Sequence, residues 1–94
     1  MLICKNVIVN GRRTSMRLDK ETWVSLADIC NREKISIHEL CSKIDDARGK
    51  AGLSSSVRLF VLTYFRTILK KYEQQAAHLA PEFTPQMILN TLSV

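Results

Sequence analysis

The chain has 94 residues and a mass of 10.7 kDa, which is enough for one small domain. Hydrophobic residues make up 46% and charged residues 24%, a balance that excludes a disordered chain. No apolar run reaches the length of a membrane span, and no secretory signal is recognisable. Fourteen Lys and Arg against nine Asp and Glu give a net charge of +5, which favours a polyanionic partner.

The three cysteines, Cys4, Cys30 and Cys41, are odd in number and contain no Cys-x-x-Cys pair. This spacing indicates neither a disulfide framework nor a zinc site, so we expect reduced thiols, a cytoplasmic location and no metal. The sequence shows no nucleophile–base–acid set and no glycine-rich phosphate loop. We therefore expect no enzyme, no catalytic residue and no cofactor.

The first predicted element is extended. Residues 7–9 are β-branched, and Asn10-Gly11 follows, a strong signal for a two-residue turn between strands. Side chains alternate along the next strand, so Thr14, Met16 and Leu18 share the inward face. The polar outward face then carries Arg13, Ser15 and Arg17. The sequence leaves open whether residues 7–18 form a hairpin.

The next two predicted elements are helices joined by a tight turn. Asp19 is a good N-cap for a first helix over residues 20–33. Its apolar stripe contains Trp23, which we expect in the core, and is widened by Val24. Ser36 opens a capping box for the second helix, which ends in a glycine-containing loop.

A third helix is predicted over roughly residues 57–72, and we expect its Phe60 to be buried. Apolar side chains cover so much of its circumference that a second subunit is needed to bury them. Prolines then mark a linker before a short last helix over residues 86–92. The sequence thus predicts a main domain in residues 1–73 and a linker with a short helix in residues 74–94.

A strand in a helical protein leaves backbone groups unpaired unless water or a partner supplies bonds. Antiparallel pairing with the same strand of a second subunit would complete the ladder around a two-fold axis. The resulting ribbon would present Arg13, Ser15 and Arg17 twice, and its width fits the major groove of B-DNA. The pattern therefore favours double-stranded DNA as a partner.

Three motifs stand together: Arg13-Thr14-Ser15 in the strand, Trp23 in the first helix, and Leu53-Ser54-Ser55 before an extra helix. They resemble short bacterial ribbon-helix-helix domains, within the DNA-binding family of the Arc and MetJ repressors. The resemblance covers roughly residues 5–69. It implies a mainly α fold with a short β-ribbon, paired across a two-fold homodimer, plus additional C-terminal helices. It also implies base contacts by Arg13, Ser15 and Arg17.

The same family holds a DNA phosphate at the N-terminus of its second helix, where unpaired amides and the helix dipole attract an anion. Many members place glycine before this helix, where this chain has Lys34. A left-handed Lys34 would cost about 1 kcal/mol, which its charge would offset near a phosphate. The resemblance thus implies phosphate contacts by Lys34, Ser36, Ile37 and His38.

We therefore expect a homodimeric, sequence-specific DNA-binding protein, a bacterial transcriptional repressor that inserts a β-ribbon in the major groove. One alternative is an antitoxin-type autorepressor in which residues 74–94 bind a protein partner. Another is a helical dimer that serves as a protein-interaction module without DNA. Salt-dependent binding to random duplex DNA would exclude this last alternative.

Overall fold

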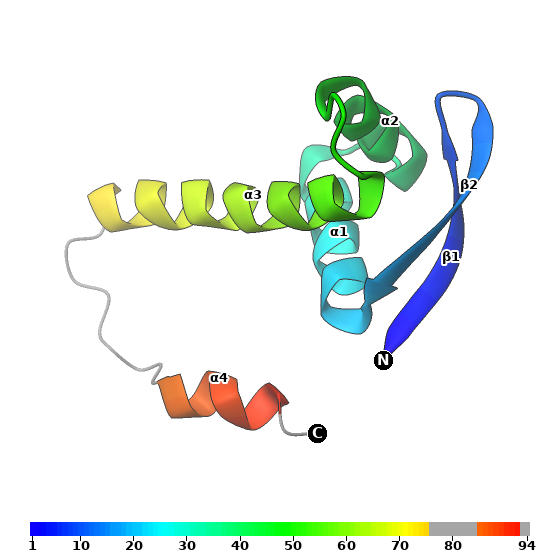
Figure 1. Ribbon diagram of the computed structural model, residues 1–94. Helices are drawn as coiled ribbons and strands as arrows, with labels where there is room; N and C mark the ends of the chain where they lie inside the picture. The colour runs from blue at the N-terminus through cyan, green and yellow to red at the C-terminus, as the bar shows by residue number, and fades with distance from the viewer. Residues whose placement is uncertain (76–84, 93–94) are drawn as a thin grey trace.

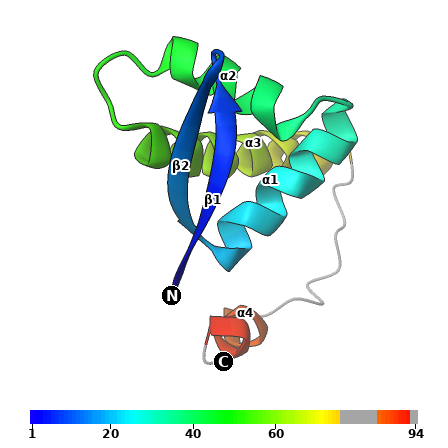
Figure 2. The ribbon, with the colours of Figure 1, turned by 90° about the vertical axis from the view of Figure 1, so that its right-hand side faces the viewer.

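The computed structural model describes residues 1–75 and 85–92, which form an antiparallel hairpin and four helices (Figure 1). In chain order the elements are β1 (Leu2–Val9), β2 (Arg12–Asp19), α1 (Lys20–Glu33), α2 (Ile37–Ala47), α3 (Leu53–Gln75) and α4 (Pro85–Leu92). Figure 2 shows the hairpin face-on, with α1, α2 and α3 packed behind it. No helix in these described ranges is long and apolar enough to cross a membrane.

The hairpin forms around a tight turn. Asn10 and Gly11 have φ values of 49° and 80°, and both positive values are what a type I′ turn requires. The register pairs Val9 with Arg12 and continues to Leu2, so β1 is much longer than its β-branched end. The structure thus shows the hairpin that the sequence left open, and β1 covers one edge of β2.

The N-terminus of α1 is capped as its sequence predicts. The Asp19 carboxylate accepts the backbone N–H of Thr22 (3.1 Å) and the Thr22 hydroxyl (2.7 Å). The side-chain bond from Thr22 is the main reason why the pKa of Asp19 lies below its usual value. The helix ends at Lys34, whose φ of 60° is left-handed, and its backbone N–H donates to the Cys30 carbonyl.

We expect Asp19→Ala to lower the free energy of unfolding by about 1 kcal/mol near neutral pH, because the cap is lost. Asp19→Asn keeps a side-chain acceptor and should cost less. Since folding lowers the pKa of Asp19, its charge stabilises the fold above about pH 4 and ceases to do so as pH falls through the folded-state pKa. Urea unfolding should thus show a wild-type advantage over Asp19→Asn that disappears in acid. An advantage independent of pH would contradict this role.

The hydrophobic core lies between the inward face of the hairpin and the helices. Met16 and Leu18 are buried and Thr14 is half-buried, as alternation along β2 predicts. The helices contribute Trp23, Leu26, Ile29, Cys30, Leu40, Cys41, Ile44 and Val57. Burial raises the pKa of Cys41 to about 11 and also raises that of Cys30, so both thiols remain protonated in the core. Val24 does not widen the apolar stripe, because it is 45% exposed.

Only the N-terminal part of α3 packs on this core. Val57 is fully buried, whereas Phe60 is half-buried in the single chain rather than buried as expected. The Tyr64 hydroxyl donates to the Glu33 carboxylate of α1, which raises the pKa of Tyr64. The helix then continues to Gln75, past the predicted start of the linker at residue 74. The division of the chain into two regions there stays a prediction.

Candidate nucleic-acid interface

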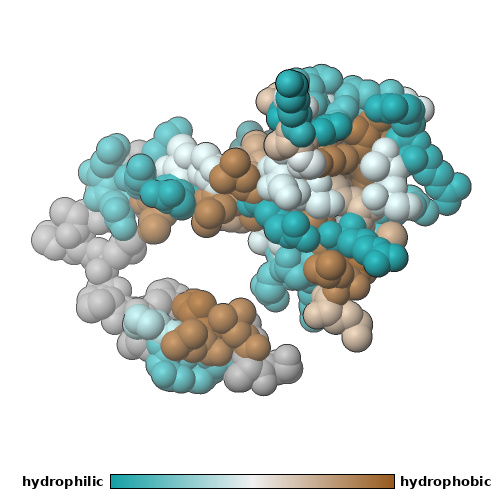
Figure 3. Space-filling model, in the orientation of Figure 1, coloured by the Kyte–Doolittle hydropathy of each residue, from teal (hydrophilic) through white to brown (hydrophobic). Residues whose placement is uncertain are grey.

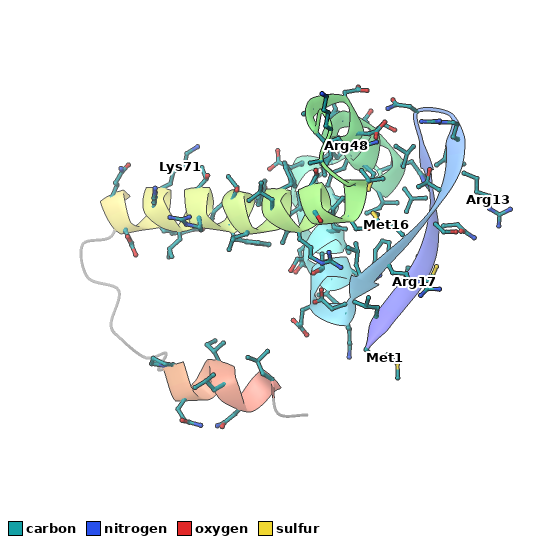
Figure 4. All side chains as sticks on the ribbon, viewed as in Figure 1. Met1, Arg13, Met16, Arg17, Arg48 and Lys71 are labelled. Carbon is teal, nitrogen blue, oxygen red and sulfur yellow. The ribbon has the colours of Figure 1, made fainter. Side chains whose placement is uncertain are left out.

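The outward face of β2 carries the three side chains predicted to contact bases. Arg13, Ser15 and Arg17 are all exposed and alternate with the core residues of the same strand. Figure 4 shows Arg13 and Arg17 on the side of the hairpin turned away from the helices, whereas Met16 points toward them. The structure therefore brings the predicted base-contacting residues together on one surface.

Strand β1 adds a second row to this surface. The register places Asn6 opposite Ser15, and the Ser15 hydroxyl donates to Asn6 Oδ1 at 2.7 Å. Cys4 lies opposite Arg17 in the same row. The sequence alone did not indicate Asn6, although a two-residue turn at Asn10-Gly11 fixes which residue faces Ser15. The outward surface is thus two strands wide within a single chain.

No acidic residue occurs in residues 1–18, so the outward surface is positively charged. The turn lies close to acids of α2 instead: Asn10 Nδ2 donates to Asp45 Oδ2 at 2.8 Å and to Asp46 Oδ1 at 3.0 Å. The bond from Arg48, and then that from Asn10, lowers the pKa of Asp45. These bonds attach the tip of the hairpin to α2.

The start of α2 lies beside β1. Ser36 caps the helix by accepting the Glu39 N–H at 3.0 Å, while the N–H groups of Ile37 and His38 have no acceptor within the helix. His38 Nδ1 accepts the backbone N–H of Ile8 at 3.0 Å. Because Nδ1 is the acceptor, the neutral ring carries its proton on Nε2, which can donate to another group.

A shallow hollow connects the hairpin surface to the start of α2. Its volume is about 450 Å³, and it is lined by Asn6, Ile8, Gly11, Arg13 and His38. One residue predicted to contact bases therefore adjoins one predicted to contact phosphate. Ile37 is instead half-buried against the core, so only its backbone amide is suited to an anion. Lys34 is exposed at the end of α1, two residues before the α2 cap.

Within residues 1–75 and 85–92, no group of three or more His, Cys, Asp or Glu side chains is placed to hold a metal ion. His38 and Cys41, which are three apart on α2, have different surroundings. The imidazole of His38 binds β1, while the Cys41 thiol is fully buried. Both residues therefore have a structural role, His38 in binding β1 and Cys41 in the core.

Residues 2–65 match the family model of the ribbon-helix-helix domain, which is more than half of the chain. The match contains the hairpin, α1, α2 and the N-terminal part of α3. No significant match to a curated protein or to a solved structure is found. The matched region includes every residue of the hairpin surface and of the α2 start.

Proposed function

The chain belongs to the ribbon-helix-helix family, and from this premise we propose that it is a homodimeric, sequence-specific DNA-binding protein that represses transcription. Members of this family are generally DNA-binding, typically non-enzymatic transcriptional regulators, and they typically dimerise. The observation that carries the proposal is the outward display of Arg13, Ser15 and Arg17 on a ribbon that has no acidic residue before Asp19, where β2 ends. In this proposal the protein acts in the cytoplasm of a bacterium, where its DNA site lies.

The free edge of β2 supports pairing with a second copy. Val9 and Arg12 close the two-residue loop, and an antiparallel ladder alternates between inward and outward backbone bonds. The N–H and C=O groups of Arg13, Ser15 and Arg17 are therefore directed away from β1. A bond from Arg58 is consistent with this direction, because its guanidinium donates to the outward-directed Arg17 carbonyl at 3.3 Å.

The corresponding edge of β1 is already occupied by α2, which packs against that strand. The Ile8 N–H on this edge donates to His38, and the N–H of Asn10, just beyond the strand, donates to Ser42 Oγ at 2.9 Å. Along β2, by contrast, Arg58 is the only side chain in the described part of the molecule that bonds to the outer edge. A partner strand would therefore add to β2, which places two copies of β2 at the centre of a four-stranded sheet.

This arrangement separates the two kinds of DNA contact. Strands lie about 4.8 Å apart, so the central pair of β2 strands fits a major groove about 12 Å wide. Each β1 then lies over a rim of the groove, and each α2 start lies beyond it, toward the phosphates. In this geometry β2 contacts bases, the α2 N-terminus contacts phosphate, and Asn6 holds the Ser15 side chain in place.

Selection of bound duplexes from a random pool tests the proposal. The full chain should enrich a short, roughly palindromic site, because a two-fold dimer presents the same strand twice. Affinity for random duplexes should be weaker and should fall steeply with salt. Failure to retain any duplex at low salt, or enrichment of sites without two-fold symmetry, would contradict the proposal.

We expect Ser15→Pro to dissociate the dimer while leaving each hairpin intact. The Ser15 N–H faces the free edge of β2, so proline removes a donor from the subunit interface and none from the ladder to β1. Thr14→Pro is the matched control, since the Thr14 N–H faces β1 and its loss should disrupt the hairpin itself. Light scattering and circular dichroism report mass and folding together. A Ser15→Pro protein as dimeric as Ser15→Ala would exclude pairing through β2.

A partner-binding role for residues 74–94 stays a prediction. The described part of that region, α4, exposes Ile88, Leu89 and Leu92. Copurification of a small basic protein with the full chain would favour the antitoxin alternative over a repressor that acts without a protein partner.

A further inference from the structure

Five large apolar side chains on α3 are left uncovered by the rest of the described chain. Their exposed fractions lie between 40% and 64%, and they are Leu59, Leu62, Phe65, Leu69 and Tyr72. Spacings of three and four residues place them along one side of the helix, which we call the α3 stripe. The residues of α3 that pack on the core, Val57, Phe60 and Tyr64, lie on a different side. Figure 3 shows apolar side chains along α3 beyond the core.

The α3 stripe is self-complementary when two copies run antiparallel. Leu62 and Leu69 lie at equal distances in sequence from the midpoint of the stripe. Leu62 of one copy therefore faces Leu69 of the other copy. Phe65 adjoins the midpoint, next to the two-fold axis. A single helix therefore supplies both halves of a closed apolar contact.

Charges at the two ends of the α3 stripe fit the same orientation. Arg58 precedes the stripe and Glu73 follows it, again at equal distances from the midpoint. Antiparallel pairing brings Arg58 of one copy opposite Glu73 of the partner subunit, at both ends of the contact. To form this ion pair, the Arg58 guanidinium leaves the Arg17 carbonyl to which it donates in the single chain. Within the described ranges Glu73 forms no ion pair, since the one ion pair there joins Arg48 to Asp45.

We propose that the α3 stripe is a second interface, at which α3 packs antiparallel against α3 of another copy of this chain. The alternative occupant within the chain is α4, which is also apolar. However, α4 has no charged residue to face Arg58 or Glu73, whereas a second α3 supplies both partners. If subunits also pair through β2, each dimer carries two α3 stripes, and the α3 contact links dimers to one another. Only this consequence rests on the pairing through β2.

Sedimentation velocity of the full chain at high micromolar concentration measures the assembly. Leu69→Glu buries two carboxylates in each α3 contact and should raise its dissociation constant more than tenfold. Thr67→Glu is the matched control, because Thr67 is exposed two residues earlier and so lies on the opposite side of the helix. Leu69 lies beyond the core, so circular dichroism should show both variants folded. Equal assembly of wild type and Leu69→Glu would overturn the proposal.

Charge reversal tests the orientation. Arg58→Glu and Glu73→Arg should each weaken the α3 contact by about three- to tenfold, because each places like charges opposite one another. The double variant restores opposite charges and should restore the wild-type constant. A double variant as weak as either single variant would overturn the antiparallel arrangement.

Two further variants separate this interface from the others. If Leu89→Glu in α4 reduces assembly as much as Leu69→Glu does, α4 covers the stripe and the proposal is wrong. Loss of all assembly in Ser15→Pro, with no effect of Leu69→Glu, would refute the α3 contact and leave pairing through β2 intact. Loss of all assembly in Leu69→Glu, with no effect of Ser15→Pro, would support the α3 contact and refute pairing through β2. If Ser15→Pro and Leu69→Glu each still assemble, and the double variant Ser15→Pro/Leu69→Glu alone is monomeric, the α3 contact and the pairing through β2 are both supported.

Discussion

Trp23→Ala is expected to unfold the protein. Trp23 is 7% exposed, and its indole N–H donates to the Ile3 carbonyl at 2.9 Å, which joins α1 to the first residues of β1. The Lys5 ammonium lies 5.2 Å from the ring centroid. Removing such a side chain from a core costs about 3–5 kcal/mol, and a small domain has only about 5–15 kcal/mol to lose.

Far-UV circular dichroism in increasing urea measures this effect. Trp23→Phe keeps much of the packing but loses the bond to Ile3, so it should be folded and less stable than wild type. Val24→Ala is the neighbouring control, and an exposed position should change stability by no more than about 0.5 kcal/mol. Wild-type stability in Trp23→Ala would show that the indole contributes nothing to the core.

The second large effect is expected on DNA selectivity. Arg17 lies on the outward face of β2, near the centre of the proposed sheet, where a guanidinium can donate two bonds to guanine O6 and N7. Arg17→Ala should therefore weaken binding to the selected site by about 1–3 kcal/mol for each guanine that Arg17 reads, while weak binding to random duplexes remains. Fluorescence anisotropy with both duplexes measures the difference.

Lys34→Ala should behave differently, because phosphates are common to all sequences. Affinity for selected and random duplexes should fall by similar factors, and the slope of log affinity against log salt should decrease by about 1 for each phosphate that Lys34 neutralises. Arg66→Ala is the control for the loss of one positive charge, because Arg66 is exposed on α3 and far in sequence from β2 and from the start of α2.

If folded Arg17→Ala keeps full preference for the selected site, β2 does not determine specificity. If neither Arg17→Ala nor Lys34→Ala affects binding, the interaction module without DNA becomes the better proposal.

Local signals predicted the helices well, because the groups that begin and end a helix lie close together in sequence. Asp19 and Ser36 cap α1 and α2, and α1 has the predicted bounds 20–33. The extent of β1 was harder to predict, since residues 2–6 become a strand only by pairing with β2. Val24 fits a helical stripe in sequence, but the hairpin and the other helices leave that side of α1 exposed.

In the candidate site, too, local patterns predicted some features, whereas others depend on contacts between residues far apart in sequence. Alternation along one strand was enough to place Arg13, Ser15 and Arg17 on the outward face. The bond between His38 and Ile8 joins residues thirty apart, so no local pattern indicates it. The contribution of Asn6 likewise depends on the hairpin register, which the sequence left open.

The attachment of the hairpin tip to α2 sets the distance between the two proposed kinds of DNA contact. Asn10 bonds to Ser42, Asp45 and Asp46, and the His38 imidazole holds the adjoining part of β1. These bonds hold the strand and the helix start at a fixed separation, with the face proposed to contact bases at one end and the amides proposed to bind phosphate at the other. In the proposed complex a DNA site has to match this separation or bend to meet it, so base pairs that the protein never touches should influence affinity through their stiffness.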